Sequence, residues 1–489
     1  MFEYIRQLGR DSLFYGILDV ASRFVNVFLV PLYTRVLSPA DYGVIDLITT
    51  LMTVLYALFY LGLDSALIYY YNQSDEPLVR RRVTTNAVTT WLLAVSLGAF
   101  AIILWRKPIS ELAVPGITDA ELLIWLSAVS LPLQAIVSAQ ALILRVQFAF
   151  RRFAFLTVSR ILMNVVFSLY LILVLRMGIK GVLLAQIYSQ LATGILGFYV
   201  MRREFDLSFN YRMAVDMVRY GAPLVLPNFT YWIIQYSERY ALLRVTSLYD
   251  IGLFAIATRL SSLVTLVSNS IDIAWMPFAL SIQKKADAPY VYARALTYYL
   301  LVSGLFGTSI ALLAREALVV FTQPAYYAAH VLVGPLVASL MLRGAFNIIA
   351  IGAFVKKKTS LLGTLGVISA LLNILFLTAL VPVMGSIGAA FATLLTRVIS
   401  ILMLYLQTRS IYPVPYEWDR VMRMAGVFTI AVFWGVVISK SNFLASFLTK
   451  TILIYPSIVI ALFLVGVIKR SEVHFVLIRL RRFLVAQHK

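Results

Sequence analysis

Long apolar segments separated by short polar loops recur along most of this chain. A helix needs about 20 apolar residues to cross a bilayer, and that length predicts fourteen membrane spans. We place them at residues 12–34, 42–63, 84–105, 120–142, 153–175, 181–201, 217–238, 249–272, 294–313, 328–351, 360–381, 386–408, 421–439 and 447–468. No loop approaches the roughly 50 residues that a soluble domain needs. The pattern therefore predicts an all-α polytopic membrane protein.

The composition supports a membrane protein rather than a soluble protein with a large core. The chain is 61% hydrophobic and its mean hydropathy is +0.88, whereas soluble domains are about 45–50% apolar. The chain has no cysteine, which excludes disulfides, thiolate metal ligands and cysteine nucleophiles. Its three histidines lie far apart in the sequence, which argues against a histidine metal site. We therefore expect neither a metal centre nor a cofactor.

The net charge of +20 lies mostly in alternate loops. Cations crowd the loops on the side of the N-terminus, as in Arg80–Arg82 and Lys356–Lys358, and are sparse in the other loops. The positive-inside rule then places both termini in the cytoplasm, and the same distribution argues against nucleic acid as a partner. Residues 469–489 mix cations with apolar residues, which predicts either an amphipathic helix on membrane lipids or a frayed tail.

A nine-residue motif occurs twice. Residues Arg35–Gly43 run Arg-Val-Leu-Ser-Pro-Ala-Asp-Tyr-Gly, and residues Arg244–Gly252 run Arg-Val-Thr-Ser-Leu-Tyr-Asp-Ile-Gly. The shared serine is suited to cap a helix N-terminus, and the shared aspartate follows three residues later, as in a capping box. The shared glycine permits the close approach of a neighbouring helix. We therefore expect helix caps at Ser38 with Asp41 and at Ser247 with Asp250.

The spacing of the two copies predicts an internal repeat. Six spans separate them, so both copies have the same orientation and the repeats are parallel. We place the first lobe at residues 1–210, the second lobe at 211–412, two extra spans within 413–468 and a cytoplasmic tail at 469–489. Arg35 and Arg244 then lie on the external face, as helix-cap neighbours or as parts of a gate or substrate contact.

Two prolines predict a bend in span 7. Pro223 and Pro227 lie four residues apart beside Gly221, and proline inside a helix frees a carbonyl group and bends the axis. The bend is either a hinge of a moving part or a harmless kink.

Arginines inside the spans are candidates for an anion-binding cavity. A charge at mid-bilayer costs at least about 2.5–3.5 kcal/mol, so each one needs a favourable environment. The planar two-pronged guanidinium group suits phosphate. The alternative for each residue is a bond to a carbonyl group of a partner helix or a place near a helix end. The candidates are Arg23, Arg160, Arg259, Arg343 and Arg397.

Carboxylates inside the spans are candidates for coupling to H⁺ or Na⁺. Asp19 lies one turn from Arg23, so it is either half of a self-neutralising pair or a titratable group in a wet cavity. Asp46 and Asp64 lie on one face of span 2, at opposite mouths or as helix-end caps. We take Asp19 and Asp64 as the coupling candidates. Glu238 and Arg239 close span 7, and Asp272 closes span 8.

Polar and aromatic residues in the second lobe suit either a glycan or helix packing. Aromatic faces and amides bind sugars, but amides also join membrane helices, and tyrosine and tryptophan also form interface belts. These residues are Tyr231, Trp232, Gln235, Tyr236, Asn269, Asn347 and Asn373.

Sequence signatures of enzymes are missing. The chain contains no Gly-x-x-x-x-Gly-Lys-Ser/Thr, Gly-x-Ser-x-Gly or His-Glu-x-x-His sequence, and no paired carboxylates lie in a predicted external loop. We therefore assign no catalytic residue, and transport must draw on an ion gradient, the membrane potential or the substrate gradient.

The segment Pro31–Gly43 resembles the start of polysaccharide-biosynthesis membrane proteins, the oligosaccharide flippases of the multidrug/oligosaccharidyl-lipid/polysaccharide exporter superfamily. Residues Tyr249–Thr258 and Leu144–Phe153 also resemble segments of that family. The resemblance implies two six-helix lobes in a V shape around a central cavity, and transport by alternating access. It implies an O-antigen-type substrate, a polyprenyl-diphosphate-linked oligosaccharide, moved from the inner to the outer leaflet of a bacterial or archaeal cytoplasmic membrane. A glycan polymerase and glycosyltransferases are then expected partners.

Three functions remain open at this stage. A flippase would use the interior arginines to hold the pyrophosphate. A multidrug-type cation antiporter of the same superfamily would need an acidic cavity, whereas the predicted interior is basic. A membrane glycosyltransferase or polymerase would need external catalytic carboxylates, which are missing.

Overall fold

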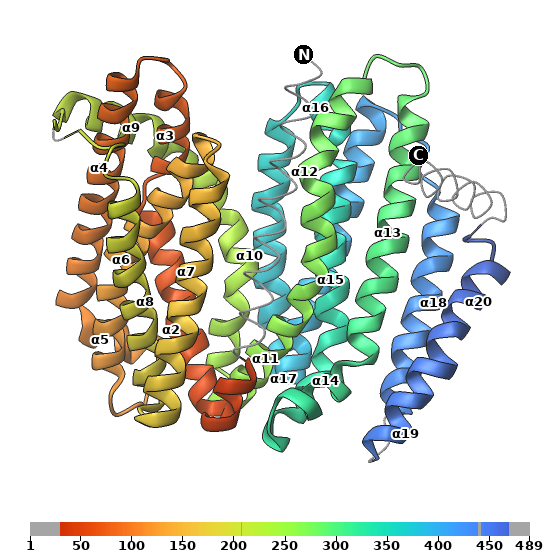
Figure 1. Cartoon of the computed structure of the whole chain (residues 1–489). Helices are drawn as coiled ribbons and strands as arrows, with labels where there is room; N and C mark the ends of the chain where they lie inside the picture. Colours follow the sequence, from red (N-terminus) through yellow and green to blue (C-terminus); the bar gives the residue numbers. More distant parts are fainter. Residues whose placement is uncertain (1–29, 207, 439–441, 469–489) are drawn as a thin grey trace, which may run out of the picture. The chain divides into compact units, whose positions relative to one another are not determined.

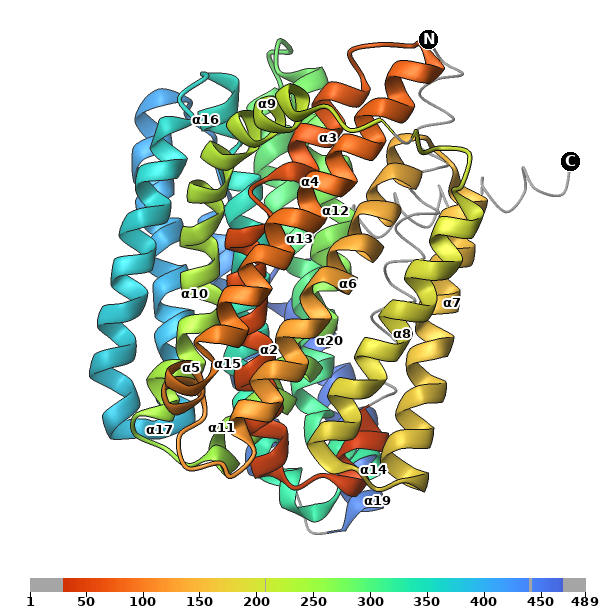
Figure 2. The same cartoon turned by 90° about the vertical axis from the view of Figure 1, so that its left-hand side faces the viewer.

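The computed structural model describes residues 30–206, 208–438 and 442–468, which are helical apart from turns and short connections (Figures 1 and 2). Most of the predicted span 12–34, with Asp19 and Arg23, and the predicted tail 469–489 lie outside the described residues. The α-helices are α2 (Pro39–Phe59), α3 (Leu63–Tyr71), α4 (Pro77–Leu104), α5 (Arg106–Ala113), α6 (Ala120–Val146), α7 (Phe150–Ser168), α8 (Gly178–Val200), α9 (Tyr211–Gly221), α10 (Val225–Leu243), α11 (Leu248–Ser261), α12 (Thr265–Ile282), α13 (Ala288–Leu312), α14 (Ala314–Phe321), α15 (His330–Ile349), α16 (Ile351–Val355), α17 (Ser360–Ile411), α18 (Trp418–Val437), α19 (Phe443–Leu448) and α20 (Tyr455–Leu464).

Eleven helical runs among the described residues are long and apolar enough to cross a membrane. They confirm an all-helical, multi-pass membrane protein. Each predicted span from 42–63 onward falls on one of these runs, except the span at 217–238, which corresponds to the end of α9 and most of α10. The total of fourteen spans stays a prediction.

The long element α17 contains two helices. Gly385 interrupts it with φ +55° and ψ −132°, a conformation that glycine adopts without the steric cost that a side chain would add. The predicted break between spans 360–381 and 386–408 is therefore present.

The chain forms two compact units. Unit 1 comprises Met1–Ile256, Phe321–Tyr326 and Gly366–Thr393, and unit 2 comprises Ala257–Val320, Tyr327–Leu365 and Leu394–Lys489. These units are groups of segments that pack together, whereas the predicted lobes were placed from the repeated motif in the sequence. The lobe boundaries therefore stay a prediction.

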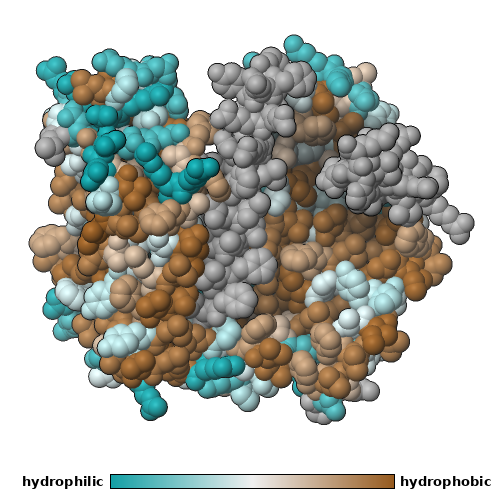
Figure 3. All heavy atoms as spheres, in the orientation of Figure 1, coloured by the Kyte–Doolittle hydropathy of each residue, from teal (hydrophilic) through white to brown (hydrophobic). Residues whose placement is uncertain are grey.

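In unit 1, α6 packs against α4, α7 and α8, and α10 packs along α2. Figure 3 shows hydrophobic side chains over the middle of the helices of this unit, and hydrophilic ones over the end where α3, α4 and α9 lie. This distribution is that of a helical unit with a lipid-facing middle and a wet end.

In unit 2, α13 is the central helix and packs against α15 and α18. Small residues allow this packing: a Cβ atom at Gly304 would lie 2.1 Å from the ring of Phe428, and one at Gly344 would lie 2.1 Å from the Tyr299 hydroxyl. A core of Trp275, Tyr292 and neighbouring apolar residues fills the space between α12, α13 and α15.

Two helix breaks in unit 1 touch each other. Between α2 and α3, Leu61 and Gly62 have φ values of +53° and +64°. Between α9 and α10, a 3-10 turn covers Ala222–Leu224 and includes Pro223, and the two helices run in clearly different directions (Figures 1 and 2). A Cβ atom at Gly62 would lie 2.3 Å from the Gly221 carbonyl oxygen. The predicted bend in span 7 is therefore present at Pro223, and Pro227 follows in α10; movement about this bend stays a prediction.

The absence of native cysteine makes the predicted orientation directly testable. Arg35, Arg203, Arg244 and Lys357 are all exposed, so single cysteines at these positions should be reactive. We expect Arg35→Cys and Arg244→Cys to react with a membrane-impermeant maleimide in intact cells. Arg203→Cys and Lys357→Cys should react only after permeabilisation. Labelling of Arg35→Cys and Arg244→Cys from opposite sides would contradict the parallel repeat.

Candidate functional site

Both copies of the motif form the predicted capping box. In the first copy the Asp41 amide donates to Ser38 Oγ at 3.2 Å, and the Ser38 amide donates to Asp41 Oδ2 at 2.9 Å. In the second copy the corresponding distances between Ser247 and Asp250 are both 3.2 Å. Pro39 is the first residue of α2, where its missing N–H costs no helical hydrogen bond. The two helix starts are therefore built alike.

The two helix starts pack directly on each other through the motif glycines. A Cβ atom at Gly43 would lie 2.2 Å from the carbonyl oxygen of Leu248, and one at Gly252 would lie 1.8 Å from that of Pro39. Both distances are far below contact range, so no side chain fits at either position. Each copy thus supplies the glycine that lets the backbone of the other approach, and we call this contact the glycine crossing (Gly43 and Gly252).

A short segment ties the two copies together. We call residues 321–326 the strap. The side-chain amide of Gln323 donates to the Arg35 carbonyl at 2.8 Å, and the Tyr326 hydroxyl donates to the Leu37 carbonyl at 2.9 Å. The strap also accepts a hydrogen bond from the second copy, since the Tyr249 hydroxyl donates to the Ala325 carbonyl at 2.6 Å. The strap therefore holds both copies at once.

The ring of Tyr326 completes this contact. It is fully buried and meets the ring of Tyr42 edge-on, with centroids 6.3 Å apart. The side chains of Arg35 and Arg244 are exposed, and within the described residues neither forms an ion pair. Their predicted roles in a gate or a substrate contact stay predictions.

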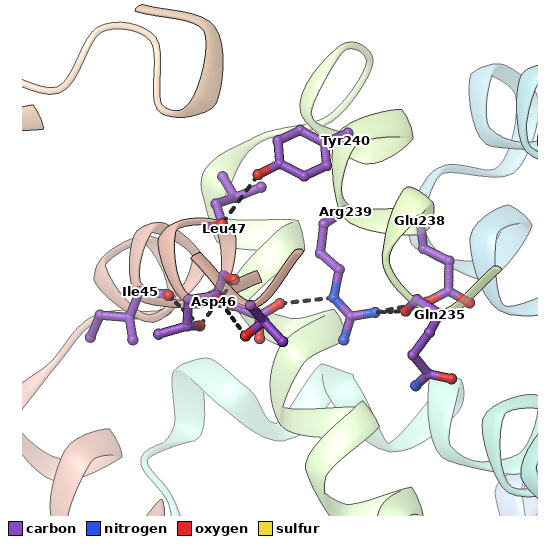
Figure 4. A network of polar contacts seen from close by, with 9 residues as sticks. Ile45, Asp46, Leu47, Gln235, Glu238, Arg239 and Tyr240 are labelled. Carbon is purple, nitrogen blue, oxygen red and sulfur yellow. Dashed lines mark hydrogen bonds and ion pairs between the residues drawn. The ribbon is translucent and has the colours of Figure 1, made fainter. Parts of the chain in front are cut away.

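A buried charge network joins α2 to α10 (Figure 4), and its Asp46 follows Gly43 by one turn of α2. Arg239 on α10 donates from Nε to Asp46 Oδ2 on α2 at 3.0 Å, and from Nη1 to Glu238 Oε2 at 2.9 Å and to the Gln235 carbonyl at 3.1 Å. The side chains of Arg239, Asp46 and Glu238 are 5%, 13% and 5% exposed. The rings of Tyr236 and Phe254 lie 5.8 and 5.3 Å from the guanidinium carbon.

The network extends from α10 to α17. Thr393 donates a short hydrogen bond to Glu238 Oε1, and the Ser237 hydroxyl donates to Asn373 Oδ1 at 2.9 Å. Asp46 and Glu238 both contact the one guanidinium group of Arg239. Since a buried ion is costly without a counter-charge, Arg239 stabilises both buried carboxylates.

The sequence shows these residues only as separate charges. Asp46 and Arg239 lie 193 residues apart, so no local spacing pairs them. One signal was present: Asp46 follows Gly43 by one turn, and Arg239 lies just before the second motif. If the two motifs pack together, as their glycines suggest, the neighbouring charges are brought close as well.

The predicted anion-site arginines fall in both units. Arg160 is exposed on α7 in unit 1, whereas Arg259, Arg343 and Arg397 are partly buried in unit 2. Whether they line one cavity stays a prediction. Arg343 on α15 lies within electrostatic range of Asp272 on α12.

The contacts of some of the remaining predicted polar residues indicate their structural roles. The Asn347 amide donates to Asp272 Oδ2 at 3.1 Å, which joins α15 to α12, and Asn373 joins α17 to α10. These contacts match the interpretation as bonds between helices. Asp64 lies in the first turn of α3 and accepts from the Ser65 amide at 2.7 Å. It makes no capping hydrogen bond among the described residues, but its charge lies near the positive end of the helix dipole. Its role in ion coupling stays a prediction.

Removal of the positive charge of Arg239 should destabilise the protein. Arg239→Gln leaves Asp46 and Glu238 buried without their counter-charge, which costs about 3–5 kcal/mol. We expect a lower thermal unfolding midpoint in detergent and recovery of most of the loss when Asp46→Asn and Glu238→Gln are added. An unchanged midpoint for Arg239→Gln would show that the charges are solvated.

A side chain at the glycine crossing should separate α2 from α11. Leu37 is 2% exposed, so Leu37→Cys should resist a membrane-impermeant maleimide in the native background and react once Gly252→Leu is added. Gly363→Leu is the matched control, because a Cβ atom there meets nothing within 4 Å. Equal labelling in the Gly252→Leu and Gly363→Leu backgrounds would contradict the proposed role of the crossing.

Several solved structures have a similar fold. The lipid II flippase MurJ in an inward closed conformation matches with a TM-score of 0.70 and 15% identity, over 91% of this chain and 98% of that one. A multidrug resistance MATE family transporter of the MOP superfamily, in an inward-facing conformation, matches with a TM-score of 0.62 and 14% identity, over 79% and 94%. The MATE multidrug transporter DinF-BH in complex with R6G matches with a TM-score of 0.58 and 17% identity, over 84% and 96%. No curated protein matches the chain.

These identities are low, so the structural matches establish the fold alone, which is that of MOP superfamily transporters. The family of polysaccharide biosynthesis proteins matches residues 32–328. That range covers more than half of the chain and includes both copies of the motif. It confirms the resemblance seen in the sequence, and the chain belongs to the polysaccharide biosynthesis protein family.

Proposed function

We propose that this protein is a flippase that moves a polyprenyl-diphosphate-linked oligosaccharide from the inner to the outer leaflet by alternating access. The observation that carries the proposal is the glycine crossing with its strap, a closed contact between two equivalent helix starts in a chain of this family. Support also comes from the fold, which it shares with a lipid II flippase. The assembly of a surface polysaccharide would follow, together with a glycan polymerase and glycosyltransferases.

In this proposal the glycine crossing is the external gate in its closed state. The predicted orientation puts both motif copies on the external face, and the crossing joins one helix from each predicted lobe. Opening would separate Gly43 from Gly252 and break the hydrogen bonds of the strap. Each capping box lies within one helix start, so it would stay intact while the two starts part.

The charge network gives the gate a means of coupling to a cation. Asp46 belongs to the first predicted lobe, and Glu238 and Arg239 belong to the second. A proton or Na⁺ bound at one of these carboxylates would change the attraction across this contact, because electrostatic interactions are strong in a low-dielectric interior. Asp19 and Asp64 remain candidates for the same coupling.

The substrate's pyrophosphate would be held by the interior arginines. Arg160, Arg259, Arg343 and Arg397 are the described candidates, and Arg23 is a fifth. Planar guanidinium groups bind phosphate oxygens in pairs, which suits a diphosphate that must leave the head-group region. The proposal requires that at least part of this set faces the substrate path.

A cation antiporter is the second candidate. It is favoured by the fold shared with multidrug transporters and by the two buried carboxylates of the network, Asp46 and Glu238. It differs from a flippase in its substrate, since a cationic drug needs an acidic site whereas a diphosphate needs a basic one.

The flippase proposal predicts a loss of surface glycan from arginine variants. Arg259→Ala and Arg397→Ala should reduce surface polysaccharide at least about tenfold, because a lost charge-assisted contact is worth roughly 1.5–3 kcal/mol, and lipid-linked oligosaccharide should accumulate inside. Surface polysaccharide and protein in the membrane are measured together, with Arg203→Ala, an exposed loop arginine, as the control. Normal glycan from both variants, combined with sensitivity to organic cations on deletion, would favour the antiporter.

A further inference from the structure

Three tyrosines from two helices form a cluster on the surface of unit 1, which we call the tyrosine platform (Tyr69, Tyr70 and Tyr220). The rings of Tyr69 on α3 and Tyr220 on α9 are stacked, with centroids 4.5 Å apart and an angle of 14° between the planes. The ring of Tyr70 meets both edge-on, at 5.3 and 6.2 Å. Tyr69 and Tyr220 are 45% and 39% exposed, so aromatic surface remains open.

The platform is held rigidly by the contact between two helix breaks. The backbones of Gly62 and Gly221 touch where α3 begins and α9 ends, so that a Cβ atom at Gly221 would lie 2.4 Å from the Leu61 carbonyl oxygen. This contact fixes the distance between the two helices. Tyr220 precedes Gly221 directly, and Tyr69 lies two turns along α3. The rings are therefore in place before any ligand arrives, which lowers the cost of binding.

A carboxylate lies beside the platform. Asp216 is exposed on α9, one turn before Tyr220. Burial raises the pKa of the Tyr70 hydroxyl, and the nearby Asp216 carboxylate raises it further, so the carboxylate is within electrostatic range of Tyr70. Neither α3 nor α9 is among the candidate membrane spans, and both lie at the hydrophilic end of unit 1 (Figure 3). The platform thus faces a wet environment.

We propose that the tyrosine platform binds a pyranose ring of the glycan, an inference that rests on the proposed flippase function. The C–H face of a pyranose is apolar and flat and packs on an open aromatic ring, which hides apolar surface of both partners from water. The carboxylate of Asp216, one turn from Tyr220 on the same helix, can accept hydrogen bonds from sugar hydroxyls. The platform combines these two requirements.

Other occupants fit these residues less well. A protein partner would need a larger apolar surface, since stable interfaces bury about 1,200–2,000 Å² in total. Interface-belt tyrosines anchor at the head-group level as amphipathic rings, a role that does not call for two helices to bring three rings together. In the predicted orientation the platform lies on the cytoplasmic side, where a flippase must first engage its glycan.

The proposal is tested by saturation-transfer NMR on the full chain in nanodiscs. The probes are free glucose, galactose, rhamnose and N-acetylglucosamine. We expect transfer to the C–H protons of at least one sugar, about fivefold weaker in the Tyr69→Ala/Tyr220→Ala variant, as for the loss of an aromatic contact worth about 1 kcal/mol. Tyr69→Phe/Tyr220→Phe keeps the rings and should keep the signal. Tyr211→Ala, an exposed tyrosine on the same helix α9, is the matched control.

The results separate this proposal from the flippase function. No transfer to any sugar, or equal transfer in the Tyr69→Ala/Tyr220→Ala and native proteins, would overturn the platform even if Arg259→Ala and Arg397→Ala abolish surface glycan. Transfer that depends on the rings would support the platform even if those arginine variants make normal glycan. Loss of the signal in the Tyr69→Phe/Tyr220→Phe variant as well would also overturn it, because stacking on the ring faces would then not be the cause.

Discussion

The structure of unit 1 depends on one close contact, the place where the backbones of two helix starts touch at Gly43 and Gly252. Any side chain there would force α2 and α11 apart, so the contact exists only because both copies of the motif end in glycine. The capping boxes stabilise the two helix starts at this contact, since they satisfy amide groups that have no partner within the helix. The strap then adds hydrogen bonds to both copies. The capping boxes, the close packing of the glycines and the hydrogen bonds of the strap thus all stabilise the same contact between α2 and α11.

The charge network is positioned by that contact. Because α2 and α11 meet at the glycines, the next turn of α2 brings Asp46 beside α10, where Arg239 also contacts Glu238. Buried charges tolerate little separation, as an unpaired ion in a low-dielectric interior is expensive. Small movements at the crossing therefore change the electrostatic energy of the network, and a change of charge in the network acts back on the crossing. In the proposed flippase, this reciprocity would link the opening of the crossing to a change of charge in the network.

A second glycine contact, between Gly62 and Gly221, separates two parts of unit 1 that have different surroundings. On one side lie α2 and α10 with the buried charges. On the other side lie the amphipathic α9 and the short α3 with their exposed tyrosines. The same device, glycine without a side chain, joins helices at both places. At the crossing it brings helix starts together, and at the breaks it lets two helices change direction while staying in contact.

The sequence by itself determined the features that depend on neighbours along the chain. Apolar segment length revealed the membrane spans, the serine and aspartate of each motif revealed the helix caps, and proline beside glycine revealed the bend in span 7. The partners of Asp46, the strap at residues 321–326 and the gathering of Tyr69 with Tyr220 were decided only by the tertiary structure. Each of these joins segments far apart in sequence, and apolar helix faces are too alike for a single sequence to show which helices pack together.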